Sequence, residues 1–331
     1  MKTGNPIKWL LQTTRTIYFR IIFSALIIVL LLVTLPLSEV WDAARRVSIL
    51  TWVFLVIAFL IIHLIGVIKW RFIVGMGRIK IPYTIAIHCY FYGLFGNLFL
   101  PSLVGGDLVR TGMAVRHVEE KEQIIIGSIV DRLLDVCSLL AIFMLGVMVT
   151  AETLSDPHRK ILVSILSILL FLLMGCITFA LIPIPERIPK KILGIIVRTR
   201  LVIRYLIKNP VYALGSFSLS VLMQGSFVLL NAFLGSICGI KISVLTWFVI
   251  WPLAKISALV PISLGGIGVR EVALAALLAP FGVLYTTAIG YGFVWEAVLI
   301  AGSLIGFAIS HLSIKDILSK KRLITDKSMP S

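Results

Sequence analysis

The chain has 331 residues, of which 59% are hydrophobic and only 14% are charged, and its mean hydropathy is +1.06. Soluble domains carry about 25% charged residues, so the polar surface is too small to cover a water-soluble globule. The net charge of +16 does not predict nucleic-acid binding, because the basic residues lie between long apolar segments and no basic module with interleaved aromatic residues is present. We therefore expect a polytopic membrane protein.

Six long apolar segments carry few charges and can each cross a hydrocarbon core of about 30 Å. In chain order they cover residues 18–37, 50–70, 123–150, 161–182, 211–236 and 284–311. The first follows a basic tail but is too long for a signal-peptide core, so we expect a retained helix. The predicted fold is an all-α, polytopic helical membrane protein in which residues 1–331 form a single transmembrane domain.

Two further apolar segments, residues 82–116 and 244–280, are interrupted by Pro and Gly. Broken backbone at membrane depth is tolerated only inside protein or beside a wet cavity, so we interpret each as a re-entrant hairpin. A pair of short full spans is the alternative. With two hairpins, most Lys and Arg residues lie on one side, which the positive-inside rule identifies as cytoplasmic. We predict a multi-pass protein of the cell (inner, cytoplasmic) membrane with both termini in the cytoplasm.

The longest polar segment, residues 185–210, alternates basic and apolar residues. This pattern predicts an amphipathic helix on the cytoplasmic face of the membrane. Residues 313–331 are predicted to form a C-terminal tail.

The two interrupted segments share a pattern at an offset of 160 residues. Pro101, Gly105, Gly106 and Arg110 in the first match Pro261, Gly265, Gly266 and Arg270 in the second. Each follows two long spans and precedes a third, and an odd number of crossings inverts the second half. We predict two inverted repeats, residues 15–150 and 160–312, each with three transmembrane helices and one broken hairpin. Such repeats place a substrate site at their interface, although Gly and Pro also recur by chance in membrane helices.

Three motifs in chain order carry a resemblance to a known family. They are Asn97 to Arg110 with Gly105, Gly106 and Asp107; Asp131, Arg132 and Asp135; and Gly265, Gly266, Gly268, Arg270 and Glu271. Together they resemble the lysylphosphatidylglycerol synthase transmembrane region family, also called flippase-like, as in the flippase half of the multiple peptide resistance factor. The resemblance covers nearly the whole chain and implies a lipid-handling membrane protein. The full synthase also carries a soluble aminoacyl-transfer domain, which we do not find in this sequence, so lysyl transfer is not expected.

Charged residues inside apolar segments are costly and are therefore functional candidates. Asp131 and Asp135 are four residues apart and share a helix face, whereas Arg132 points roughly 100° away. A structural ion pair, such as Asp131 with Arg110 or Arg270, is the alternative. Glu296, deep in the sixth span, could relay protons, bind a cation or pair with Lys255.

Each glycine pair is followed by an arginine. Exposed backbone N–H groups at a helix start and a nearby guanidinium can together hold a phosphate. We therefore predict a site for an anionic head group at each hairpin tip, with Asp107 and Glu271 as neutralising partners. Alternatively, Arg110 and Arg270 mark the hairpin ends and snorkel to lipid head groups.

The predicted substrate-binding set follows from these arguments. It comprises Asn97, Gly105, Gly106, Asp107, Arg110, Asp131, Arg132, Asp135, Gly265, Gly266, Arg270, Glu271 and Glu296. No catalytic residues or cofactor are expected, because the sequence shows no Ser-His-Asp order and no Walker loop. No metal ligands are expected, because the four cysteines form no CxxC or Cys/His cluster.

The predicted function is binding and translocation of a lipid with an anionic or polar head group. The alternatives are a membrane-embedded lipid head-group transferase and a non-catalytic partner of a lipid or glycolipid biosynthesis complex. Expected partners are membrane lipids, with lipid-biosynthesis enzymes as a second candidate, and no nucleic acid is expected.

Overall fold

The computed structural model describes most of the chain after the first predicted span. The described residues are 41–42, 45–75, 81–100, 105–118, 120–150, 156–181, 197, 200–201, 204, 206–258 and 268–327. The first span, most of the basic segment 185–210 and the turn at Gly265 and Gly266 lie outside them. Within the described residues the structure is helical and has no strand, which confirms the all-α prediction.

Long helices occupy the positions of the remaining predicted spans. Those long and apolar enough to cross a membrane are α3 (Ile49–Gly75), α6 (Lys121–Thr150), α9 (Pro210–Ile237) and the Tyr285–Leu312 part of α12 (Tyr285–Lys327). The fourth predicted span corresponds to α7 (Asp156–Leu181). Helices suit these sequences because every backbone polar group must be satisfied within its own segment in lipid.

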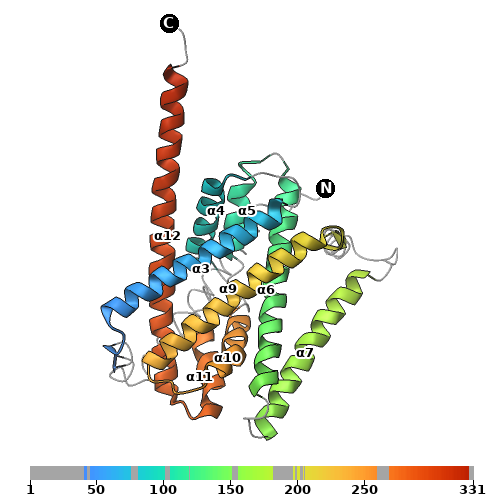
Figure 1. Cartoon of the computed structure of the whole chain (residues 1–331), viewed down its shortest axis with the longest axis vertical. Helices are drawn as coiled ribbons and strands as arrows, with labels where there is room; N and C mark the ends of the chain where they lie inside the picture. The colour runs from blue at the N-terminus through green and yellow to red at the C-terminus, as the bar shows by residue number, and fades with distance from the viewer. Residues whose placement is uncertain are drawn as a thin grey trace, which may run out of the picture.

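The last helix is longer than predicted. We expected a tail from residue 313, but α12 continues to Lys327 and extends well beyond the other helices (Figure 1). The boundary was placed where the apolar run ends, and the polar sequence that follows keeps the helical conformation.

Each interrupted segment forms two short helices instead of one long one. The first contains α4 (Tyr83–Gly96) and α5 (Gly105–Ala114), and the second contains α10 (Val244–Ser257), α11 (Val269–Leu278) and the 3-10 turn η1 (Ala279–Phe281). The longer helix of each pair has 14 residues, or about 21 Å, which is less than the roughly 30 Å needed to cross. Within each pair the two helices pack together, as a hairpin requires. Entry and exit on one side of the membrane stay a prediction.

The helices pack across the two halves of the chain. Helix α3 packs along α9, and the two run as neighbouring diagonal helices in Figure 1. The first arm of each hairpin packs against the long helix of the other half, α4 against α12 and α10 against α6. The matching packing of the two hairpin arms agrees with a repeat, although the inverted orientation of the halves stays a prediction.

Two glycines separated by the repeat offset bring these helices close. A Cβ added at Gly146 on α6 would lie 2.7 Å from the carbonyl carbon of Phe248 on α10. A Cβ added at Gly306 on α12 would lie 3.2 Å from Cγ of Phe91 on α4. Such distances exclude larger residues without a shift of the helices, so both contacts depend on glycine.

Two apolar clusters flank the centre of the molecule. The larger contains Phe59, Trp251 and Trp295 and joins α3, α6, α9, α10, α11 and α12. The smaller contains Trp70 and Tyr90 and joins α3, α4, α5 and the start of α6. Residues from both clusters contribute to the walls of the cavity described next.

Candidate functional site: a charged cavity between the hairpins

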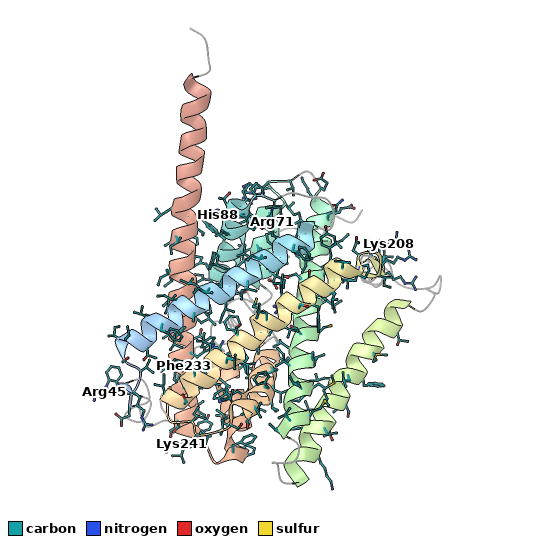
Figure 2. All side chains as sticks on the ribbon, viewed as in Figure 1. Arg45, Arg71, His88, Lys208, Phe233 and Lys241 are labelled. Carbon is teal, nitrogen blue, oxygen red and sulfur yellow. The ribbon has the colours of Figure 1, made fainter. Side chains whose placement is uncertain are left out.

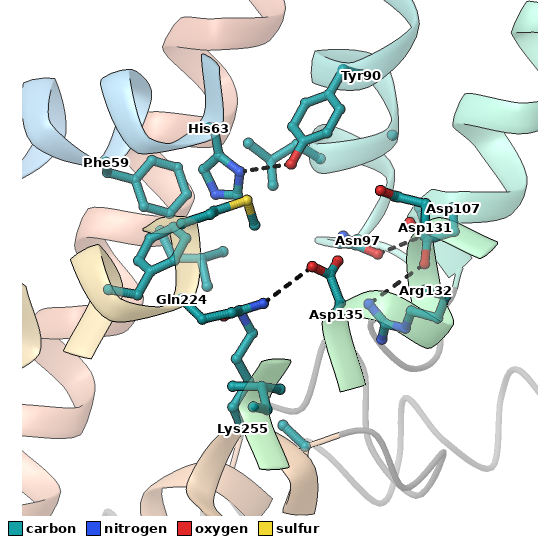
Figure 3. Close-up of a pocket in the computed structure, with 18 of the residues that line it drawn as sticks. Phe59, His63, Tyr90, Asn97, Asp107, Asp131, Arg132, Asp135, Gln224 and Lys255 are labelled. Carbon is teal, nitrogen blue, oxygen red and sulfur yellow. Dashed lines mark hydrogen bonds and ion pairs between the residues drawn. The ribbon is translucent and has the colours of Figure 1, made fainter. Parts of the chain in front are cut away.

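A cavity of about 130 Å³ lies where the two hairpins meet the long helices, and it can hold several water molecules (Figure 3). Its apolar walls include Phe59, Phe227, Trp251 and Trp295. Its charged and amide side chains are Asn97, Asp107, Arg110, Asp131, Arg132, Asp135, Gln224, Lys255 and Arg270. The cavity therefore presents a polar lining within a bundle of largely apolar helices.

Arg110 of α5 is held by two carboxylates. Its Nη2 atom lies 2.8 Å from Oδ2 of Asp131 and 3.1 Å from Oδ1 of Asp107. The residue is only 5% exposed, so the alternative that it snorkels to lipid head groups is wrong. The expected pair with Asp131 is present, and Asp107 is the neutralising partner that the sequence suggested. The contact with Asp131 attaches the second arm of the first hairpin to α6.

Lys69 of α3 was not among the predicted site residues. Its Nζ lies 3.0 Å from Oδ1 of Asp131 and 2.5 Å from Oδ1 of Asp135. Both acids therefore share one face of α6, as their spacing predicted. The second span was predicted to end at residue 70, which placed Lys69 at its boundary, whereas α3 continues to Gly75 and Lys69 is 1% exposed. The apolar Phe72-Ile73-Val74 run that follows it was the available signal.

Arg132 faces away from this pair and toward α5. Its Nη1 lies 3.5 Å from Oδ2 of Asp107, and its side chain is 29% exposed. Of the cavity arginines it has the longest ion-pair distance and the greatest exposure.

Gln224 of α9 connects Asp135 to the second hairpin. Its Nε2 lies 3.5 Å from Oδ1 of Asp135, and its Oε1 accepts a hydrogen bond of 2.7 Å from Nζ of Lys255 (Figure 3). Lys255 thus extends from α10 into the same polar network. Its suggested pairing with Glu296 is wrong, because Glu296 binds Arg270 instead.

Arg270 of α11 repeats the arrangement of Arg110 with different partners. Its Nη2 lies 2.9 Å from Oε1 of Glu271 and also contacts Glu296 of α12. Glu271 is fully buried, and its Oε2 accepts a 2.6 Å hydrogen bond from the backbone N–H of Gly268. Gly268 has φ of +84°, which favours glycine at the start of α11. Arg270 is 3% exposed, so snorkelling is wrong here too, and Glu271 is the neutralising partner expected from sequence.

The first glycine pair serves helix packing. The N–H of Gly106 donates a 2.7 Å hydrogen bond to Oδ1 of Asn97, which satisfies a donor at the start of α5. A Cβ at Gly106 would lie 2.6 Å from Cγ of Asn97, and one at Gly93 would lie 2.6 Å from the Gly106 carbonyl oxygen. Gly105 contacts Leu100 and, unlike Asn97 and Gly106, does not line the cavity.

The described charged residues form two groups at one cavity. Ion pairs join Lys69, Asp107, Arg110, Asp131, Arg132 and Asp135, and Gln224 links Lys255 to Asp135. Arg270, Glu271 and Glu296 form the second group, of which Arg270 lines the cavity. We use "charged network" for these ten charged residues together. It contains as many acidic as basic residues and so carries no formal net charge. Among the described residues, no group of three or more His, Cys, Asp or Glu side chains could hold a metal ion.

The family model described as the lysylphosphatidylglycerol synthase TM region matches residues 17–306. The chain belongs to this family. Comparisons with curated proteins and with solved structures find no match. The family match covers both hairpins and the complete charged network, so the cavity lies within the family's own domain.

Proposed function

We propose that this member of the lysylphosphatidylglycerol synthase TM region family binds a lipid with an anionic or polar head group and translocates it between leaflets. The observation that supports this proposal most directly is the charged cavity between both hairpins and the long apolar helices. A head group would enter this cavity while the acyl chains remain in the bilayer. The outer faces of the helices carry exposed apolar side chains such as Ile57, Leu145 and Leu229, which suit contact with acyl chains.

Energetics support a functional role for the charged network. Each charged side chain at the bilayer centre costs about 2.5–3.5 kcal/mol on insertion scales. Ion pairing removes part of this cost, but apolar residues of similar volume often give equal or greater stability than a buried ion pair. Selection for stability alone therefore does not favour a network of this size. A polar route for a head group does require it.

The proposed route uses the predicted repeats. Inverted repeats allow alternating access by movement of one half against the other around a central site. Reciprocal packing of each hairpin on the opposite half supports this, because the cavity is shared by both halves. In this proposal both termini and segment 185–210 face the cytoplasm.

Transport can be measured in proteoliposomes that contain phosphatidylglycerol with a dithionite-reducible fluorophore on the head group. In protein-free vesicles dithionite reduces only the outer-leaflet label, whereas translocation exposes the inner-leaflet label as well. We expect faster and more complete reduction with the wild-type protein and with Lys208→Gln, because Lys208 is exposed outside the charged network. Asp131→Asn should slow it. No acceleration by the wild type, with or without an imposed ion gradient, would refute the proposal.

A comparison of lipid extracts from cells with and without the protein addresses the transferase alternative. Transport without chemistry leaves the set of lipid species unchanged. A lipid species that disappears with the protein would favour a head-group transferase.

A further inference from the structure

Lys255 differs from the other cavity cations in how it is neutralised. Arg110 and Arg270 each contact two carboxylates, as does Lys69 of the charged network, and Arg132 contacts one. Lys255 forms no ion pair with a carboxylate among the described residues, and its Nζ donates instead to the neutral amide oxygen of Gln224. An ammonium group has three donors, so Lys255 retains capacity for an acceptor.

Two tryptophans of the cavity wall carry indole N–H groups that have no acceptor among the described residues. Trp251 lies one helical turn before Lys255 on α10, and its ring centroid lies 5.2 Å from that of Trp295 on α12. Both residues line the cavity, are at least 97% buried, and have no hydrogen-bond partner for the indole Nε1 among the described residues. A buried donor without a partner costs about 1–3 kcal/mol, and native proteins contain few of them.

Phe227 of the cavity wall links Lys255 to the two tryptophans. Phe227 contacts Trp295 with ring centroids 6.1 Å apart, and Nζ of Lys255 lies 5.0 Å from the Phe227 centroid. The Lys255 ammonium and the two indole N–H groups can only donate hydrogen bonds, so a cation is not a suitable ligand for this cluster. A group rich in acceptor oxygens fits, and a phosphate supplies several of them with negative charge.

We propose that Lys255 binds the phosphate of the head group in the cavity, with the indole N–H groups of Trp251 and Trp295 as neutral donors. This inference rests on the proposed function and assigns its binding contact. It differs from the sequence prediction, in which Arg110 and Arg270 hold the head group. Those two arginines are occupied by carboxylates and join each hairpin to a long helix.

The experiment measures equilibrium binding of a fluorescent phosphatidylglycerol to the purified full chain in detergent micelles, by anisotropy. Competitors are unlabelled phosphatidylglycerol, diacylglycerol, glycerol 3-phosphate and inorganic phosphate. Lys255→Gln should weaken binding by roughly tenfold to a hundredfold, because a charge-assisted contact is lost. Lys255→Arg should restore most of the affinity. Lys241→Gln is the matched control, since Lys241 is exposed at the far end of α9 from Lys208 (Figure 2).

A tryptophan readout tests the second part of the proposal. Binding of unlabelled phosphatidylglycerol should change the intrinsic fluorescence, and Trp295→Phe should reduce both this change and the affinity by about threefold to tenfold. Diacylglycerol, which lacks phosphate, should neither compete nor change the signal.

The outcomes separate the inference from the proposed function. Unchanged phosphatidylglycerol affinity in a folded Lys255→Gln variant overturns the inference and leaves transport intact. Lys255-dependent binding of inorganic phosphate without any lipid binding supports the phosphate site and overturns lipid handling. A wild-type protein that binds none of these ligands overturns both.

Discussion

Replacement of Lys69 by methionine tests whether the charged network holds the helix bundle together. Met has about the length of the lysine side chain but no charge, so among the described residues the Asp135 carboxylate is left with only the 3.5 Å Gln224 contact. Asp131 keeps Arg110 at 2.8 Å. Breaking a buried ion pair by removal of one partner costs about 3–5 kcal/mol, because the remaining charge is buried without compensation.

This loss should be visible in the apparent melting temperature in detergent. At about 2–4 °C for each kcal/mol, Lys69→Met should lower it by roughly 6–20 °C. Lys208→Met is the control, because Lys208 is exposed, and it should melt within about 2 °C of the wild type. The assay is loss of monodisperse protein by fluorescence-detected size-exclusion chromatography after heating.

Double variants make the test sharper. Lys69→Met with Asp135→Asn removes the lysine and the carboxylate that depends on it, so it should recover much of the lost stability. Lys69→Met with Asp131→Asn should recover less, because Arg110 then loses its closest partner. If Lys69→Met melts like the wild type, or if both double variants melt alike, the assignment of Lys69 as the shared cation of α6 is wrong.

Three further predictions use other parts of the structure. Gly106→Val should lower the melting temperature and abolish transport, because overpacking at the α4–α5 contact costs about 1–3 kcal/mol. Gly112→Val is the control on the same helix, and it should be tolerated because a side chain there meets open space. Glu271→Gln should destabilise the protein by about 1–3 kcal/mol in the same melting assay, since the buried charge on Arg270 loses a partner; unchanged melting would contradict this role. In a background without native cysteines, a membrane-impermeant maleimide added to intact cells should label Ser155→Cys and not Ile195→Cys, and the opposite pattern would invert the proposed topology.

The helix positions could be predicted because they depend on local sequence. Apolar runs of more than twenty residues determined α3, α6, α7 and α9 to within five residues at either end. Pro and Gly determined the breaks between α4 and α5 and between α10 and α11. These features act within one segment, so they can be read without knowledge of the neighbouring helices.

Pairing between helices was only partly predictable. Arg110 with Asp131 followed from the cost of buried charge, and Glu271 with Arg270 from their adjacency. The role of Lys69 was missed, because a lysine near the end of an apolar run is typical of the cytoplasmic end of a membrane span. The distinction depends on where α3 ends and which helix faces it, and both are properties of the packed bundle.

The unequal pairing in the charged network bears on function. If the charges served structure alone, equal numbers of acids and bases could pair one to one and satisfy every group. Among the described residues, however, Lys69, Arg110 and Arg270 each contact two carboxylates, Arg132 has one ion-pair contact at 3.5 Å, and Lys255 donates to a neutral amide. The weakly paired Arg132 and Lys255 line the cavity, and so do Arg110 and Arg270, whose carboxylate contacts also join each hairpin to a long helix. Because positive charge without an acidic partner is costly inside a membrane protein, its placement at the cavity wall favours a site that an anionic group completes.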